Sequence, residues 1–112
     1  MQYVPKYENK IDYIVNLVKD FKNINILELG VREGISTKKF LEICNQNNGK
    51  LVSIDIDDCS KVSNDKRWTF IHSSDDNFEI VDKEINSKLD LIYIDSYHEP
   101  NHVEKVFNHY YN

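Results

Sequence analysis

The feature that most constrains the fold of this chain is an alternation of two hydrophobic periods along the sequence. Four stretches carry apolar residues every three or four positions, which is the period of an amphipathic helix. They are residues 11–21, 40–44, 78–85 and 103–110. Short runs of strand length alternate with them, at residues 24–29, 51–56, 68–72 and 89–95. This order is typical of parallel strands joined by right-handed crossovers, so we predict an α/β fold.

Length and composition fit one domain. The chain has 112 residues, of which 40% are apolar. That share is slightly below the roughly 45–50% of globular proteins and far above a disordered composition. No repeat, low-complexity tract or linker interrupts the sequence. We therefore expect one domain over residues 1–112, with an N-terminal helix over residues 9–22 and the rest of the domain over residues 24–112.

Charge and cysteine content exclude several classes of protein. The chain has 19 acidic and 14 basic residues, and its net charge of -5 disfavours binding to the phosphate backbone of nucleic acids. No run approaches the ~18 apolar residues of a membrane span, and the N-terminus lacks the pattern of a signal peptide. Two cysteines do not make a disulfide framework. We therefore expect a cytoplasmic protein with reduced thiols that binds neither nucleic acid nor membrane.

Three acidic residues stand at the ends of predicted strands, namely Glu28, Asp55 and Asp95. The carboxyl ends of parallel strands lie at one edge of a sheet, where ligands of such folds bind, so we expect the three carboxylates to meet there. The alternative is that each acid only caps a turn. A glycine-containing loop at residues 30–37 directly follows the first of these strands and favours a binding site.

The loop does not match a motif for nucleotide phosphates. In the dinucleotide pattern G-x-G-x-x-G, Arg32 and Ile35 stand where the second and third glycines should be, and no lysine follows Gly34 as in a P-loop. Asp55 lies 25 residues after Gly30, near the ~20-residue offset at which an acid reaches a ribose. An acid beside the loop would repel phosphate and favour a cation. The pattern therefore indicates a nucleoside ligand that carries positive charge.

Capping residues predict where several helices begin and end. Ser36–Thr37 can cap the second helix, and Gly49 is placed to end it. Asp76 and Glu79 have the spacing of a capping box before the third helix. Pro100 suits the first turn of the last helix.

Three motifs in this order and spacing resemble the class I S-adenosylmethionine-dependent methyltransferases. They are ILELGVREGIST at residues 26–37, LVSIDID at residues 51–57 and LDLIYIDSYH at residues 89–98. The resemblance covers about residues 24–107 and is greatest to small-molecule O-methyltransferases, which read approximately E-x-G-x-x-x-G-x-S-T and then F-I-D-G-x-H. It implies a Rossmann-like three-layer sandwich, with a parallel sheet of about four strands in the order 3-2-1-4 and helices on both faces. It also implies S-adenosylmethionine as cofactor and methyl transfer to a hydroxyl of a small molecule or sugar.

The resemblance gives each residue of the first motif a role. Glu28, Gly30 and Gly34 would flank the methionine part of the cofactor. Ser36 and Thr37, at the start of a helix, would donate hydrogen bonds to its carboxylate, because helix N-termini favour anions.

The later motifs would bind the rest of the cofactor and the acceptor. Asp55 would hold the ribose hydroxyls, and Ser74 and Asp75 would lie near the adenine. Asp95 would face the methyl group and the acceptor, and His98 would act as the base for a hydroxyl acceptor, since its unperturbed pKa is about 6.5. The alternative for His98 is a solvated loop histidine. Asp95 could bind a divalent metal, as in some O-methyltransferases, but one carboxylate does not make a magnesium site, so the sequence supports no metal.

A zinc motif competes with this interpretation. Residues 98–102 spell H-E-x-x-H, which binds zinc when both histidines lie on one face of a helix. Pro100 hardly allows a helix to run through from His98. The G-x-x-H continuation of one zinc family is also absent after His102, so we reject a zinc site.

The resemblance ends in the helix after the fourth predicted strand, whereas the family fold has seven strands. The sequence therefore contains the cofactor half of that fold and little of the acceptor half. The edge beside the fourth strand would be open and could pair with a second copy or a partner chain. Three alternatives follow: a methyltransferase that is minimal or completed by a partner chain, a truncated non-catalytic cofactor-binding or interaction module, and an oxidoreductase half. The glycine spacing disfavours the last.

Overall fold

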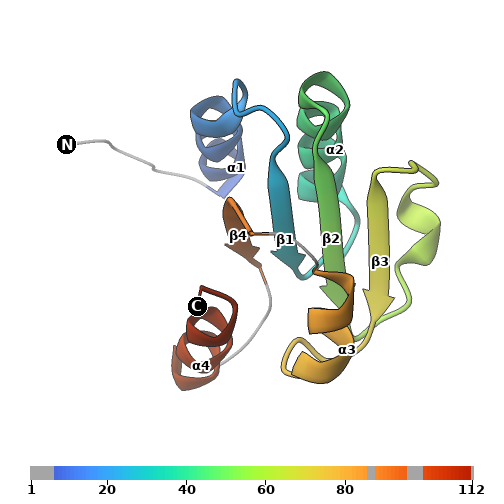
Figure 1. The fold of residues 1–112 in the computed structure, drawn as a ribbon, viewed down its shortest axis with the longest axis vertical. Helices are drawn as coiled ribbons and strands as arrows, with labels where there is room; N and C mark the ends of the chain where they lie inside the picture. Colours follow the sequence, from blue (N-terminus) through green and yellow to red (C-terminus); the bar gives the residue numbers. More distant parts are fainter. Residues whose placement is uncertain (1–6, 86–87, 96–99, 112) are drawn as a thin grey trace.

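Four strands form one parallel sheet in the order β3-β2-β1-β4 in the computed structural model, which describes residues 7–85, 88–95 and 100–111 (Figure 1). The strands are β1 (Asn25–Leu29), β2 (Lys50–Asp55), β3 (Trp68–His72) and β4 (Leu91–Ile94). The helices are α1 (Tyr7–Val18), α2 (Ile35–Asn47), α3 (Phe78–Glu84) and α4 (Pro100–Tyr111), and a short 3-10 helix, η1 (Ser60–Val62), precedes β3. The predicted α/β class and the predicted strand order are confirmed.

Helices cover both faces of the sheet and make a three-layer arrangement. α1 and α2 pack on one face, and α3 and α4 pack on the other (Figure 1). Each face of the sheet has its own hydrophobic core, and successive residues of β1 point to the two cores in turn. Ile26 packs against α1 and α2, and Leu27 packs against α3 and α4. Both side chains are buried. A strand covered on both faces needs apolar residues on both, which explains the nearly continuous apolar run of β1.

Helix α1 ends earlier than its periodicity predicts. It stops at Val18, whereas the predicted helix runs to residue 22. The Phe21 N–H then donates to the Val18 carbonyl oxygen at 3.0 Å, and Asn23 adopts a left-handed φ of 56°. Phe21, counted in the predicted apolar stripe, is 50% exposed. The prediction was wrong because the chain must reverse direction before Asn25 to enter β1, and periodicity alone does not contain that requirement.

The predicted caps of α2 are also wrong at both ends. Gly34 precedes the helix with a left-handed φ of 88° and no side-chain cap, while Ser36 and Thr37 lie inside the first turn. At the other end Asn48, with φ of 57°, takes the left-handed position that was assigned to Gly49. An asparagine tolerates this conformation better than most residues, so the glycine is required for a different reason.

The third helix lacks the predicted capping box. α3 begins after Asn77, whose side chain makes no capping hydrogen bond. The Asp76 carboxylate accepts a hydrogen bond from the Ser74 hydroxyl instead, so it does not cap the helix. The start of α4 at Pro100 is confirmed.

We expect Gly49→Ala to destabilise the fold by about 2 kcal/mol, because overpacking a filled site forces the surroundings to move. A methyl group at this position would lie 2.6 Å from the carbonyl oxygen of Ile24, which is backbone and cannot rotate away. Urea unfolding would measure the loss. Asn48→Gly at the neighbouring left-handed position is the control: it gives up two exposed hydrogen bonds, to Asn23 and from Arg67, and we expect it to cost less than about 1 kcal/mol. Equal losses in both variants would contradict the steric argument.

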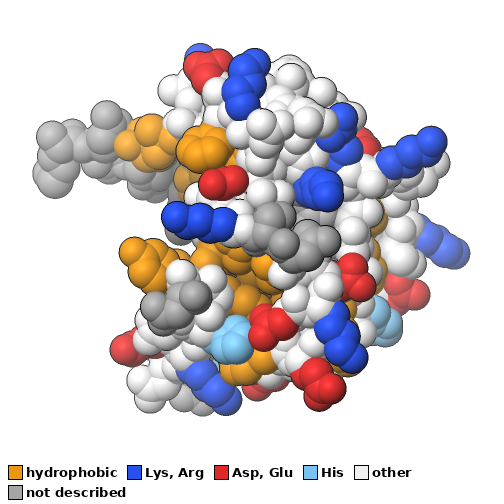
Figure 2. Space-filling view, in the orientation of Figure 1, with side chains coloured by type: hydrophobic (Ala, Val, Ile, Leu, Met, Phe, Trp, Pro, Cys, Tyr) orange, Lys and Arg blue, Asp and Glu red, His pale blue; other side chains and the backbone are white. Residues whose placement is uncertain are grey.

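A groove lined by both apolar and charged residues, Lys88 and Asp90 among them, borders β4. It has a volume of about 700 Å³ and lies among β4, α3 and α4, where Leu91, Phe107 and Tyr111 contribute to its walls. Figure 2 shows apolar side chains at the surface in this region. Pairing of this edge with a second copy or a partner chain stays a prediction. Among the described residues, no helix is long and apolar enough to cross a membrane.

Candidate functional site

Backbone hydrogen bonds tie the carboxyl ends of the four strands together. The Asp95 N–H donates to the Leu29 carbonyl oxygen at 2.8 Å, which joins β4 to β1. The Gly30 N–H donates to the Ile54 carbonyl oxygen of β2 at 2.8 Å. The Ser73 N–H donates to the Asp55 carbonyl oxygen at 3.0 Å. Asp55 and Asp95 therefore stand at one edge of the sheet, and the strand order reverses there between β1 and β4.

Glu28 does not share this edge. Its side chain is fully buried between β1 and α2, where it accepts hydrogen bonds from the hydroxyls of Ser36, Thr37 (2.6 Å) and Ser53 (2.7 Å). The Ser53 hydroxyl oxygen accepts in turn from Trp68 Nε1 at 2.9 Å. These five residues are called the Glu28 cluster below. The structure thus corrects the expectation of three carboxylates at one edge: two are there, and the third is inside.

Burial raises the pKa of Glu28, and the three hydroxyl donors offset only part of this effect. The negative charge of Asp95 raises the pKa further. The hydroxyls of Ser36 and Thr37 donate hydrogen bonds to Glu28. The same hydroxyl groups are therefore not available to donate to a ligand carboxylate. The predicted contact of these two residues with the methionine carboxylate stays a prediction.

Asp55 holds the glycine loop in place. Its Oδ2 accepts from the backbone N–H groups of Val31 at 2.8 Å and Arg32 at 3.1 Å, and its Oδ1 accepts from the Asp57 N–H at 2.9 Å. Partial burial opposes ionisation, but these backbone donors and the Cys59 thiol outweigh it and lower the pKa of Asp55. A ribose diol would have to share this carboxylate with the loop. Sequence reasoning missed this second role, because the spacing of the motifs does not show which backbone groups face the acid.

A cavity of about 190 Å³ lies between the glycine loop and the end of β4, where the strand order reverses. Two predicted site residues, Ser36 and Asp95, line it. Its remaining lining residues are Ile11, Val31, Arg32, Glu33, Ile35 and Tyr93. Three of the lining residues are ionisable, namely Arg32, Glu33 and Asp95, and the rest of the lining is mainly apolar. No motif marks Ile11, because it comes from α1 and reaches the cavity only through tertiary packing.

The space in front of Gly34 is filled by the protein itself. A methyl group there would lie 2.3 Å from Cγ1 of Val62 in η1, and the φ of 88° strains any other residue. Gly34 therefore allows η1 to approach the loop, and its predicted contact with the methionine part of a ligand is not tested.

We expect Gly34→Ala to cost about 2–3 kcal/mol of stability, from backbone strain and the clash together. Val62→Ala in the same chain should recover the steric part and leave the strain. Thermal or urea unfolding of the two variants measures this. A double variant no more stable than Gly34→Ala alone would contradict the assigned clash.

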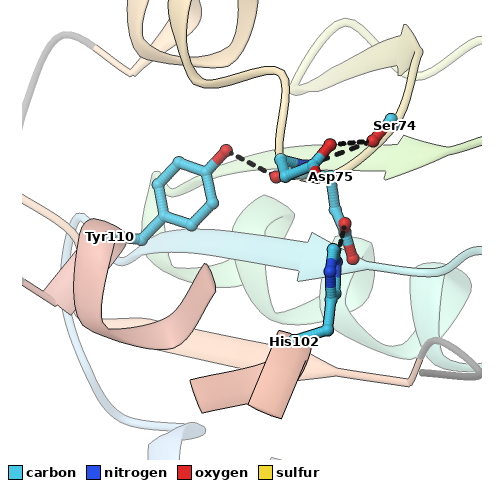
Figure 3. Close-up of polar contacts among 5 residues, drawn as sticks. Ser74, Asp75, His102 and Tyr110 are labelled. Carbon is cyan, nitrogen blue, oxygen red and sulfur yellow. Dashed lines mark hydrogen bonds and ion pairs between the residues drawn. The ribbon is translucent and has the colours of Figure 1, made fainter. Parts of the chain in front are cut away.

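The loop after β3 is fastened to α4 (Figure 3). The Asp75 side chain is 6% exposed, and its Oδ1 accepts from Nε2 of His102 at 2.8 Å. Ser74 is exposed and donates its hydroxyl proton to Asp76. Both predicted adenine neighbours thus stand at the carboxyl edge, next to the end of β2.

The predicted base His98 lies outside the described residues. His102, the second histidine of the H-E-x-x-H pattern, is in α4 and bonds to Asp75. Among the residues that the structure describes, no group of three histidine, cysteine, aspartate or glutamate side chains could hold a metal ion.

Fold and site together define a Rossmann-like α/β protein with a charged cavity at the carboxyl edge of its sheet. Residues 27–112 match the family described as Methyltransferase domain. The match covers most of the chain, so the chain belongs to this methyltransferase domain family. No curated protein sequence matches the chain.

One solved structure with a similar fold is the crystal structure of the SAH-bound methyltransferase PaMTH1 from Podospora anserina. The TM-score is 0.62 at 19% sequence identity, and the similarity covers 81% of this chain and 42% of that chain. This chain therefore spans less than half the length of PaMTH1. At this identity the similarity shows a shared fold.

Proposed function

We propose that this chain binds S-adenosylmethionine at the carboxyl edge of its sheet and transfers its methyl group to a hydroxyl of a small molecule or sugar. The observation that carries the proposal is the charged cavity between the glycine loop and Asp95, at the point where the strand order reverses. Ligands of open α/β sheets bind at this point. Membership of the methyltransferase domain family supports the same conclusion.

The charges of the cavity fit one end of this cofactor. Arg32 can pair with a carboxylate, while Glu33 and Asp95 can pair with an ammonium or sulfonium group. The volume of about 190 Å³ is below the roughly 300–1,000 Å³ of pockets that enclose a whole ligand. We therefore place the methionine end in the cavity. The adenosine would extend along the edge past Asp55 toward Asp75.

The chemistry requires little of the protein beyond alignment. The sulfonium supplies an activated methyl group when the cofactor is bound. Holding an acceptor oxygen in line with that group is the main task, and we assign it to Asp95, which lines the cavity at the end of β4. His98 remains the proposed base for a hydroxyl acceptor. No metal is part of the proposal.

A non-catalytic cofactor-binding module that needs a partner chain is the second candidate. It is favoured by the fact that the similarity covers only 42% of PaMTH1, so more than half of that protein has no counterpart in the match.

Calorimetry with S-adenosylhomocysteine tests cofactor binding without a substrate. Transfer of a labelled methyl group to a panel of phenols, sugars and other hydroxyl compounds then tests catalysis. We expect both binding and transfer. Binding with no transfer to any acceptor would favour the module, and no binding by a folded sample would refute both candidates.

A further inference from the structure

Helix α4 holds the loop at residues 73–77 by two hydrogen bonds to a single residue (Figure 3). His102 Nε2 donates to the Asp75 carboxylate at 2.8 Å, and the Tyr110 hydroxyl donates to the Asp75 carbonyl oxygen at 2.9 Å. Asp75 and Tyr110 are buried. One bond fixes the side chain and the other fixes the peptide plane, so the loop is restrained in both position and orientation.

These bonds link opposite ends of the sheet. α4 follows β4 at one end of the strand order, whereas residues 73–77 follow β3 at the other end. The predicted adenine neighbours Ser74 and Asp75 belong to this loop. Asp95, which lines the charged cavity, stands at the end of β4 shortly before α4. α4 therefore follows one end of the proposed cofactor site in the chain and holds the other end by hydrogen bonds.

A second histidine–aspartate pair on α4 lacks these properties. His109 Nε2 donates to the Asp82 carboxylate of α3 at 2.9 Å, but the Asp82 side chain is 51% exposed against 6% for Asp75. Hydrogen bonds of exposed charges contribute little, while a buried carboxylate is costly without a donor. The buried pair therefore has the stronger restraint, and the exposed pair offers a matched comparison on the same helix.

We propose that His102 and Tyr110 are positioning residues that hold the loop at residues 73–77 against the nucleobase, so that α4 sets the selectivity for adenine. This inference rests on the proposed function, because it takes the loop as the base-binding segment. A loop that moves loses hydrogen bonds to the base, and such bonds give more selectivity than apolar contact does.

The test compares binding of S-adenosylhomocysteine with binding of S-inosylhomocysteine, in which a carbonyl replaces the amino group of the base. We expect His102→Ala to weaken binding of the adenosine compound by about tenfold, the effect of one lost hydrogen bond to a charged group. We expect the preference over the inosine compound to fall toward one. Asp82→Ala removes the exposed pair but keeps the His109 ring, which stacks on Phe78 and contacts Tyr110, so it should leave both the affinity and the preference within about twofold of wild type.

Two milder variants keep the test valid if His102→Ala does not fold. His102→Gln retains an N–H donor of similar reach and should restore the preference, whereas Tyr110→Phe removes only the hydroxyl and should lower it. An unchanged preference in both His102→Ala and Tyr110→Phe would overturn the inference, as would equal effects of His102→Ala and Asp82→Ala. If wild-type protein binds neither compound, the proposed function fails first, and the inference fails with it.

Discussion

Glu28→Ala is expected to lower the free energy of unfolding by about 3–5 kcal/mol, because the variant leaves buried hydroxyls unpaired and a cavity in the core. The Glu28 carboxylate is the common acceptor for hydroxyls from α2 and β2. Its removal unlinks those elements from β1 at once. A domain of this size has a total stability of about 5–15 kcal/mol, so the variant should be close to unfolding at 37 °C.

Glu28→Gln is the matched control, because it keeps the size and one carbonyl acceptor. We expect it to cost about 1–2 kcal/mol. Urea unfolding followed by the fluorescence of Trp68, which belongs to the Glu28 cluster, would measure the stability of both variants. A loss below about 1 kcal/mol for Glu28→Ala would show that the cluster is not a structural link.

The raised pKa of Glu28 also predicts a pH dependence. Its folded pKa lies above its unfolded value of about 4.3, so the folded protein binds this proton more tightly than the unfolded chain does. The stability that Glu28 contributes to the fold is therefore complete below about pH 4 and is lost as pH rises through the folded pKa. The free energy of unfolding of wild type minus that of Glu28→Gln should decline as the pH is raised from 4 to 8. A flat difference would contradict the assigned burial effect.

Asp55→Ala should weaken binding of S-adenosylhomocysteine by about a hundredfold, on the proposed function. Two effects add: the ribose loses its acceptor, and the glycine loop loses the carboxylate that holds the N–H groups of Val31 and Arg32. Hydrogen bonds to a charged group contribute about 1.5–3 kcal/mol each, which sets the size of the effect. Calorimetry measures the affinity.

Asp57→Ala is the control for charge. It removes an exposed carboxylate two residues away and keeps the backbone N–H that donates to Asp55, so affinity should change by less than about twofold. His98→Ala should also affect cofactor affinity far less than Asp55→Ala, because His98 is assigned to the acceptor. Equal effects of these variants would contradict the assigned roles.

Much of the fold followed from the sequence. The strand run of residues 68–72 and the start of the last helix at Pro100 were predicted to the residue. These successes share a physical reason: period, proline geometry and buried-strand composition are local properties. The end of α1 and the caps of α2 were wrong, since both depend on where the chain must go next.

The site was predicted in part. The spacing of the motifs located Asp55 and Asp95 at the carboxyl edge, because strand ends of a parallel sheet meet wherever the loops run. It could not show that Glu28 turns inward, since its neighbours along the strand do not reveal that hydroxyls of α2 lie opposite.

The sequence by itself determined the α/β class and the edge at which charged groups gather, because these depend on hydrophobic period and on the spacing of strand ends. The strand order was predicted only through the resemblance to a known family. Only the tertiary structure decided what each charge does there. It buried Glu28 as a structural link, gave Asp55 to the backbone of the glycine loop and joined Asp75 to α4. Such contacts connect residues distant in sequence, and the packing of helices on the sheet sets their distances.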